Sequence, residues 1–409
     1  MRRTPRTRIT AEARVAWPRR RSSRPAHARS DEEHFRQVCN QWLSGPSVAP
    51  SSRSAKTRAK GGAGVDPMKH DIIVVGASAG GIEAISALVK GLPRDLAASL
   101  FVVVHVPPYA PSMLPQILGR AGPLTVCHAR DGEAIQPHHI YVAPPDKHII
   151  LEPGRMLVRR GPKENRFRPS IDALFRSAAY VYGPRVIGVV LSGVLDDGTS
   201  GLWSIKRLGG TVIVQAPEDA MHPEMPENAM EHVEIDHVSR ASDLGPLLSR
   251  LADERAPTEL RVDDEHLRRL ALEVEIAADD GAFDKGIMKW GDMAAFTCPE
   301  CHGALVRLEE GTWLRFRCHT GHAFTPSTLL AGITESVEQS LWQAMRAVEE
   351  QAMLLDHVAK HLRDTGQTGR AAQFASKAQQ ARDQARVIHD SLPEHEQLSE
   401  DSAPADARS

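Results

Sequence analysis

The chain has 409 residues, which is enough for two or three domains, and 41% of them are apolar, so it can bury ordinary globular cores. No apolar run reaches the roughly 18 residues of a membrane-spanning helix, which excludes an integral membrane protein and predicts no membrane insertion. The net charge of −2 hides an asymmetry. Residues 1–60 carry 15 Lys and Arg against 4 Asp and Glu, and the rest of the chain is net acidic.

The basic segment 1–67 is rich in Arg, Ser, Pro and Ala and has neither a helical nor an alternating apolar period. This composition predicts disorder. The segment has features of a transit peptide and of a nucleic-acid-binding arm. A secretory signal is not expected, because no apolar stretch follows the first arginines.

A buried strand is predicted at 71–75, followed by Gly76-Ala-Ser-Ala-Gly80 and by a helical pattern over 82–90. Small residues around a serine on a tight strand-to-helix turn are typical of a nucleophile elbow, which lifts the Ser78 hydroxyl out of the sheet. A phosphate-binding turn is the alternative. However, Ser78 stands where a dinucleotide fingerprint needs its second glycine, and the turn lacks the Gly-Lys-Ser/Thr ending of a P-loop.

Two further buried strands are predicted, at 100–104 before His105 and at 186–191 before the pair Asp196 and Asp197. The pattern indicates an α/β fold with a doubly wound, mainly parallel sheet and helices on both faces. Taken singly, His105 could be a core histidine and Asp-Asp-Gly a plain turn. Together with the elbow they bring the three residue types of acyl transfer to one sheet edge.

The roles follow from proton chemistry. Ser78 would attack a carbonyl carbon, His105 would take its proton, and Asp197 or Asp196 would orient the imidazole. The backbone N–H of Ala79 would be the first oxyanion donor. The chain order Ser, His, Asp differs from that of α/β-hydrolases, so that fold is not assumed.

Several separated blocks resemble the chemotaxis protein-glutamate methylesterases of the CheB type, over roughly Asp71 to Leu251. The order of the blocks makes the resemblance specific. The blocks are Gly76-Ala-Ser-Ala-Gly-Gly81, His105-Val-Pro107, Val142-Ala-Pro-Pro-Asp-Lys-His148, Arg168-Pro-Ser-Ile-Asp172 with Leu174-Phe175, Leu191-Ser-Gly-Val-Leu-Asp-Asp-Gly198, and Met225-Pro226 with Asn228-Ala229.

The resemblance implies that Asp197, not Asp196, completes the triad and that the backbone N–H of Val194 is the second oxyanion donor. The family commonly has Met at position 194 and Thr at position 79, where this chain has Val194 and Ala79. Because backbone N–H groups and not side chains would stabilise the oxyanion, we expect these departures to leave activity intact. The implied substrate is the glutamate γ-methyl ester on the cytoplasmic helices of chemoreceptors, with deamidation of glutamine in some members, and the implied location is the cytoplasm.

Members of this family often carry an amino-terminal receiver domain, but the basic segment is too short and too polar to form one. Activation by phosphorylation within the same chain is therefore not expected. Members usually begin near the position of Met68, so residues 1–67 are interpreted as an upstream extension that is not translated or has no function.

Three further cysteines suggest a metal site. Cys298 and Cys301 form a Cys-x-x-Cys knuckle, and a hairpin-like stretch separates them from Cys318. This layout is typical of a zinc ribbon, with His322 as the fourth ligand and His319 as its rival. A closed site of this kind is structural, so Zn²⁺ is expected there and no cofactor is expected for catalysis. A redox role for the knuckle is disfavoured because no thioredoxin-like βαβ frame surrounds it.

Beyond the ribbon, apolar positions recur every three or four residues from Leu330 to Leu362, and a second, alanine-rich stripe runs from Ala371 to Ile388. An antiparallel hairpin is the simplest interpretation, and docking onto receptor or signalling helices is the alternative. The predicted organisation is 1–67 basic extension, 68–255 catalytic domain, 256–292 acidic linker with one helix over 265–277, 293–326 zinc ribbon, 327–392 helical hairpin and 393–409 disordered tail.

Three function classes stay open at this point. The first is a serine esterase acting on a protein. The second is a regulatory or adaptor protein with the same fold but without efficient turnover. The third is a nucleic-acid-associated protein, which is disfavoured because residues 293–326 lack an aromatic and basic platform.

Overall fold

The computed structural model describes residues 69–109, 111–257, 264–279, 281–310 and 313–400, all within one compact unit that spans Arg58–Ser409. The predicted basic extension and the last nine residues lie outside the described residues. Among the helices described, none combines the length and the apolar character that a membrane crossing requires.

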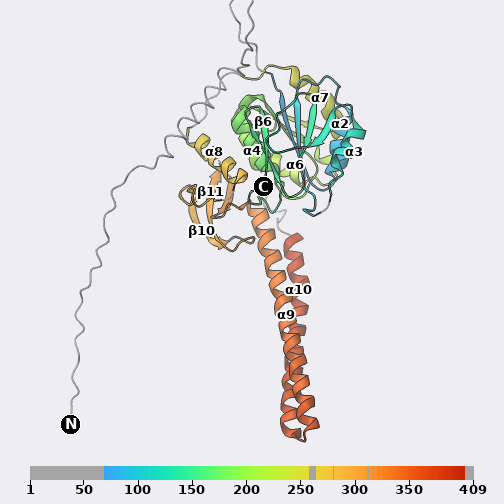
Figure 1. Ribbon diagram of the computed structural model, residues 1–409, viewed down its shortest axis with the longest axis vertical. Coiled ribbons are helices and arrows are strands. Elements are labelled where there is room, and N and C mark those ends of the chain that lie inside the picture. Colours follow the sequence, from blue (N-terminus) through green and yellow to red (C-terminus); the bar gives the residue numbers. More distant parts are fainter. Residues whose placement is uncertain (1–68, 110, 258–263, 280, 311–312, 401–409) are drawn as a thin grey trace, which may run out of the picture. The chain divides into compact units, whose positions relative to one another are not determined.

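Seven strands form one parallel sheet: β1 (Ile72–Ala77), β2 (Ser99–Val104), β3 (Thr125–His128), β4 (His139–Val142), β7 (Val186–Val190), β8 (Thr211–Gln215) and β9 (His237–Ser239). Their order is β3-β4-β2-β1-β7-β8-β9, so the chain starts in the middle and builds the two halves in turn (Figure 1). Every residue of β1, β2 and β7 is buried, as expected for strands covered on both faces.

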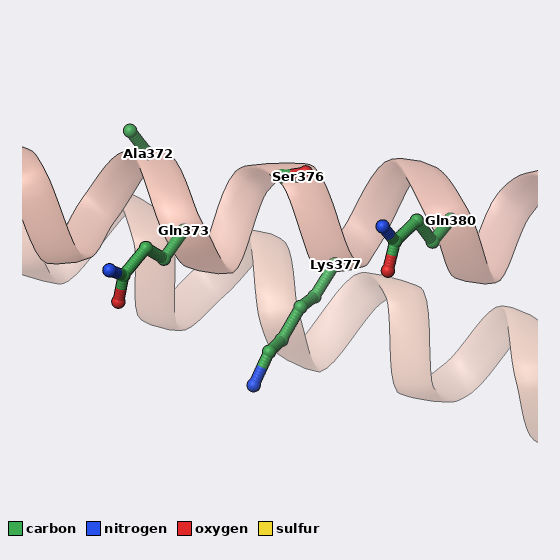
Figure 2. A pocket seen from close by; sticks show the side chains of 5 residues that line it. All are labelled: Ala372, Gln373, Ser376, Lys377 and Gln380. Atoms are coloured by element: carbon green, nitrogen blue, oxygen red, sulfur yellow. The ribbon is translucent and has the colours of Figure 1, made fainter.

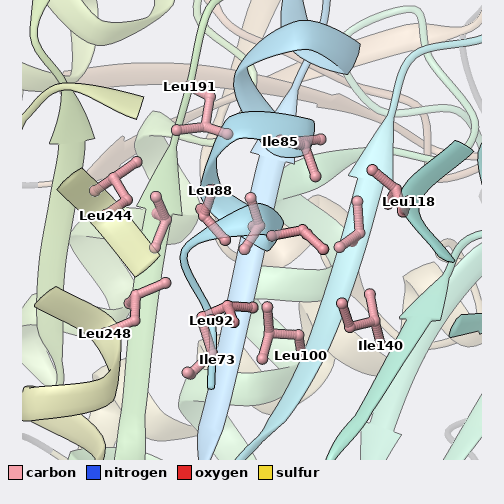
Figure 3. Packing of buried hydrophobic residues seen from close by; sticks show 14 of the residues in the cluster. Ile73, Ile85, Leu88, Leu92, Leu100, Leu118, Ile140, Leu191, Leu244 and Leu248 are labelled. Carbon is pink, nitrogen blue, oxygen red and sulfur yellow. The ribbon is translucent and has the colours of Figure 1, made fainter. Parts of the chain in front are cut away.

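Helices cover both faces of this sheet. One face carries α2 (Gly81–Lys90), α3 (Leu114–Ala121) and α7 (Ala241–Asp253), and its core is drawn in Figure 3. The other carries α4 (Ile171–Tyr182) and α5 (Thr199–Arg207), with α6 (Glu224–His232) beside α5. On that second face Gly76 and Gly188 leave the room that Ile171 and Ile205 fill. The predicted doubly wound α/β fold is confirmed.

Smaller elements complete this domain. An antiparallel pair, β5 (His148–Glu152) and β6 (Arg155–Arg159), packs on α4. Single 3-10 turns span Gly183–Arg185 and Pro217–Asp219, and a third in the C-terminal region spans Ile287–Lys289.

The C-terminal extension, defined here as residues 264–400, contains one helix, a small sheet and a helical hairpin. Helix α8 (Asp264–Ala278) precedes an antiparallel sheet of β10 (Asp292–Thr297), β11 (Ala304–Glu310), β12 (Trp313–Cys318) and β13 (Ala323–Phe324). Helices α9 (Pro326–Asp364) and α10 (Thr368–Glu400) then run side by side, in orange and red in Figure 1. A Thr325 capping box starts α9.

The structure departs from the sequence predictions at three places. Residues 393–400 continue α10 instead of forming a disordered tail. Helix α8 is packed on both sides and so does not form a linker. Ala277 packs against the domain built on the parallel sheet, and Ile276 packs against the small sheet of the extension. Leu330, placed in the apolar stripe of α9, is exposed, because its neighbour Leu329 fills the ribbon core.

Candidate functional site

Ser78 follows β1 directly, at the carboxyl edge of the sheet. Its N–H donates to the carbonyl of Ser192, which follows β7, and Gly80 turns the chain into α2 with φ of 71°. A Cβ at Gly80 would lie 2.6 Å from the Met221 Cβ and 2.8 Å from the Ser192 Oγ. The turn therefore needs its small residues both for the left-handed backbone and for the close approach of the neighbouring loops.

The structure brings Ser78, His105 and Asp197 together from the ends of three adjacent strands, β1, β2 and β7. His105 Nδ1 lies 3.1 Å from Ser78 Oγ, and His105 Nε2 lies 2.8 Å from Asp197 Oδ2. The side chains of His105 and Asp197 are only 4% and 2% exposed. Adjacent parallel strands end at the same edge, which is why residues so far apart in sequence meet here.

The carboxylate of Asp197 is held by the first turn of α4. Its Oδ2 accepts the Ile171 N–H at 2.8 Å, and its Oδ1 accepts the Ser170 hydroxyl at 3.0 Å and the Asn165 amide at 2.9 Å. Burial alone would raise the pKa of Asp197, but the hydrogen bond from His105 and these further donors outweigh burial and hold that pKa below its ordinary value. The helix N-terminus favours the same charged form.

This environment fixes the proton arrangement of His105. An ionised Asp197 can only accept hydrogen bonds, so His105 Nε2 carries the proton and donates it to that carboxylate. The lone pair of Nδ1 then faces Ser78 and can accept the hydroxyl proton. The Phe167 ring is stacked on the imidazole, with centroids 3.6 Å apart and planes 7° apart, and restricts its tilt.

Asp196, the alternative to Asp197, points elsewhere. Its Oδ1 accepts the hydroxyl of Thr325, the residue that caps α9, at 2.8 Å. Burial raises the pKa of Asp196 to about 6, and the charge of Asp197 adds to this effect. Asp196 therefore joins the parallel-sheet domain to the C-terminal extension, and Asp197, not Asp196, accepts the hydrogen bond from His105.

The loop 193–195, called here the oxyanion loop, approaches Ser78 closely. A Cβ at Gly193 would lie 2.8 Å from the Ser78 Cβ and 2.0 Å from the Met225 Sδ. Leu195 adopts a left-handed backbone with φ of 65°, and α6 holds it there. Its N–H donates to Glu224 at 3.0 Å and its carbonyl accepts the Asn228 amide at 2.8 Å. Strain of this kind is common beside active sites.

The two residues whose N–H groups are predicted as oxyanion donors belong to the turn at Ser78 and to the oxyanion loop. Ala79 follows the nucleophile and Val194 sits at the tip of the oxyanion loop. Among the described residues, neither N–H donates a hydrogen bond to a protein acceptor. The hydrogen bonds nearby are donated by the N–H groups of Ser78, Gly193 and Leu195. The role of both N–H groups as oxyanion donors stays a prediction.

The extension contains a cluster that could hold a metal ion, built from Cys298, Cys301, Cys318 and His322. The Sγ atoms of Cys301 and Cys318 are 3.7 Å apart, and His322 Nδ1 lies 3.5 Å from Cys318 Sγ and 3.7 Å from Cys298 Sγ. Tetrahedral zinc with Zn–S bonds of about 2.3 Å and Zn–N bonds of about 2.0 to 2.1 Å places two sulfur ligands about 3.8 Å apart and a sulfur and a nitrogen ligand roughly 3.5 to 3.6 Å apart. The donor set and its spacing fit Zn²⁺.

His319, the rival to His322, does not join this cluster. Its ring lies over Gly303, where a Cβ would be 2.0 Å from His319 Cε1. The Thr320 hydroxyl instead lies among the ligand atoms, 2.9 Å from Cys318 Sγ and 3.2 Å from Cys301 Sγ. A hydroxyl so placed can donate to thiolate sulfur and orient the ligands.

A surface depression on α10 lies away from this chemistry. Figure 2 shows the side chains that line it, which are the small residues Ala372 and Ser376 and the longer, flexible residues Gln373, Lys377 and Gln380. Only Lys377 carries a charge, and it lies over the Phe374 ring. We assign no role to this depression. Docking of the α9–α10 hairpin onto signalling partners stays a prediction.

Sequence reasoning missed several residues around the triad. Asn165 and Phe167 touch Asp197 and His105, and Glu224 holds the oxyanion loop. The one available signal was Asn165 itself, because Asn tolerates a left-handed backbone better than most residues.

Comparison with known proteins identifies a family for part of this chain. The family described as "CheB methylesterase" matches residues 73–248. Protein-glutamate methylesterase/protein-glutamine glutaminase 1 of Myxococcus xanthus (strain DK1622) is 35% identical over 214 residues, which are 51% of this chain and 61% of that protein. A Leptospira interrogans relative with the same two activities in its name is 35% identical over 185 residues, 45% of this chain and 96% of the relative.

Two comparisons involve Thermotoga maritima. Its protein-glutamate methylesterase/protein-glutamine glutaminase is 34% identical over 171 residues, 41% of this chain and 50% of that protein. The crystal structure of its CheB methylesterase catalytic domain has 33% sequence identity and a TM-score of 0.44, covering 45% of this chain and 99% of the domain. The chain thus spans only part of the Myxococcus and Thermotoga proteins, and its whole C-terminal extension lies outside the family match.

Proposed function

We propose that this chain, which belongs to the CheB methylesterase family, hydrolyses glutamate γ-methyl esters on the cytoplasmic helices of chemoreceptors by a serine mechanism. One observation carries the proposal. The His105 ring bridges Ser78 Oγ at 3.1 Å and Asp197 Oδ2 at 2.8 Å, so a base and its orienting carboxylate stand ready behind the nucleophile. This substrate requires the chain to act in the cytoplasm.

The first half of the reaction forms an acyl-enzyme. Ser78 Oγ attacks the γ-carbonyl carbon while its proton passes to His105 Nδ1, and Asp197 stabilises the resulting imidazolium. The carbonyl oxygen becomes an oxyanion, which the N–H groups of Ala79 and Val194 accommodate. His105 then returns the proton to the methoxide oxygen, the C–O bond breaks and methanol leaves.

The second half releases the product. Water loses a proton to His105 Nδ1 and attacks the Ser78 ester, and collapse of the second tetrahedral intermediate returns that proton to Ser78 Oγ. The product is a glutamate side chain. Deamidation of glutamine follows the same steps with ammonia in place of methanol.

We further propose that Cys298, Cys301, Cys318 and His322 hold a structural Zn²⁺. Four protein ligands close the tetrahedron, so no position remains for water or substrate, and the ion would stabilise the ribbon without taking part in hydrolysis. Metal analysis of the purified chain tests this assignment, with one equivalent of zinc expected.

Methanol release from methylated receptor membranes tests the catalytic proposal, comparing the full chain with Ser78→Ala. We expect release by the wild type and a loss of about three or more orders of magnitude in the variant. A folded wild type that releases neither methanol nor ammonia would instead favour the regulatory or adaptor function.

A further inference from the structure

Asn165 links the triad to the C-terminal extension through both ends of its amide. The Nδ2 group donates to Asp197 Oδ1 and to Asp172 Oδ2, each at 2.9 Å. The Oδ1 atom accepts the Thr325 N–H at 3.2 Å and the Thr328 hydroxyl at 3.3 Å, both from the start of α9. The side chain is buried and uses all four of its hydrogen-bonding positions. The ionised carboxylate of Asp197 requires a donor, which fixes the orientation of the amide.

The backbone of this segment depends on the extension as well. Asn165 and Arg166 are consecutive left-handed residues, with φ of 51° and 72°. The Asn165 N–H donates to the Ala323 carbonyl of β13 at 2.7 Å, and the Ala323 N–H donates back to Lys163 at 3.2 Å. Non-glycine residues in this region are strained, and such a conformation persists only where its surroundings hold it. Here β13 supplies that hold.

The residues on either side of Asn165 make the same connection. Glu164 is fully buried and accepts a hydrogen bond from Arg317 of β12 at 2.8 Å and another from Arg176 of α4. Phe167, which exchanges backbone hydrogen bonds with Glu164, covers the His105 ring. One short loop, residues 164–170, therefore contacts the extension on one side and two triad members on the other.

We propose that Asn165 is a positioning residue for Asp197, and that the C-terminal extension, through β13 and the first turn of α9, sets its orientation. The docked extension then belongs to the competent active site, although it supplies no group that touches substrate. This inference rests on the proposed serine mechanism. A family match that ends at residue 248 does not contain the partner residues 323–328.

A serine-directed fluorophosphonate tests this without reference to the natural substrate. Ser78 Oγ forms a bond to phosphorus, fluoride leaves, and the serine proton passes to His105. Intact mass gives two separate quantities, the final number of labels and the rate constant of labelling. A folding defect lowers the first, whereas a misplaced Asp197 lowers the second.

The variants are made in the full chain. For Asn165→Ala we expect one label per chain at a rate constant about tenfold to a hundredfold below wild type, because Asp197 loses a donor to its charged form. Lys163→Ala is the matched control, since it removes the ion pair with Glu300 across the same interface without touching Asn165. It should label at the wild-type rate. Full labelling of Asn165→Ala within twofold of the wild-type rate would overturn the proposal.

A pair at position 328 provides the test from the side of the extension. Thr328→Val removes the hydroxyl that lies 3.3 Å from Asn165 Oδ1 and that also completes the capping box of α9, whereas Thr328→Ser keeps it. We expect labelling several-fold slower in the first and restored in the second. If Asn165→Ala does not fold, this pair decides, and equal rate constants would refute the coupling. A wild type that labels at Ser78 but releases no methanol refutes the proposed substrate alone.

Discussion

The single variants Asp196→Asn and Asp197→Asn should have opposite consequences, although the two residues are adjacent and chemically identical. Asp197 accepts from His105 and from the first turn of α4. Asp196 accepts from Thr325 and is one of the buried carboxylates at the interface with the extension. The two variants therefore separate the proposed catalytic role of the Asp197 charge from the loss of folding stability that the buried Asp196 charge causes.

The magnitude for Asp196 follows from its pKa. Burial raises that pKa to about 6 from an ordinary 3.8, a difference of about two units. Each unit corresponds to about 1.4 kcal/mol, so the ionised carboxylate costs the folded state roughly 3 kcal/mol above pH 6. The folded state binds the proton more tightly than the unfolded state, so this contribution to stability is greatest at low pH and is lost as the pH rises from about 4 to about 6.

Asp196→Asn removes the charge and keeps an oxygen that can accept the Thr325 hydroxyl. Relative to wild type, the variant should gain almost nothing in free energy of unfolding at pH 4 and about 3 kcal/mol at pH 8. Urea denaturation of the full chain at both pH values measures the difference. Methanol release by Asp196→Asn should persist, while Asp197→Asn should lose about three to four orders of magnitude in kcat. A variant at 196 that is destabilised at pH 8, or whose effect does not depend on pH, would show that the buried charge of Asp196 does not lower the stability of the folded state.

Three further predictions concern the elements around the triad. Cys298→Ser should lose the zinc measured by metal analysis and slow Ser78 labelling while the parallel sheet stays folded by circular dichroism; stoichiometric zinc in the variant would contradict the ligand assignment. Gly193→Ala should abolish methanol release, because its Cβ would overlap Met225 Sδ and press on Ser78 Cβ; normal turnover would show that the oxyanion loop has more freedom than described. Val194→Met should leave kcat within about twofold, because only the backbone N–H at 194 acts, and a larger loss would point to a role for the side chain.

Much of the catalytic geometry could be predicted from the sequence, because it follows from one rule of topology. Ser78, His105 and Asp197 each follow a short buried strand, and parallel strands end at a common edge. The choice between Asp196 and Asp197 could not be made on this basis. It depends on which carboxylate meets α4 and which meets α9, and adjacent residues carry no local sign of that difference.

The interface with the extension was missed for a related reason. The sequence places Glu273 of α8 in an acidic linker, since a charged residue on a helix is ordinarily solvated. In the structure it is buried and bonds Arg315 and Arg317, which lie more than 40 residues further along the chain. Asn165 likewise receives hydrogen bonds from residues some 160 positions away. Partners at such separations leave no periodic pattern, so only the folded structure reveals them.

Methanol release from methylated receptor membranes, with the wild type, Ser78→Ala and Asp197→Asn assayed side by side at equal concentrations of folded chain, shows whether hydrolysis passes through Ser78 and needs Asp197. We expect steady release by the wild type and almost none by either variant. Release by Ser78→Ala at the wild-type rate would mean that hydrolysis does not pass through this serine.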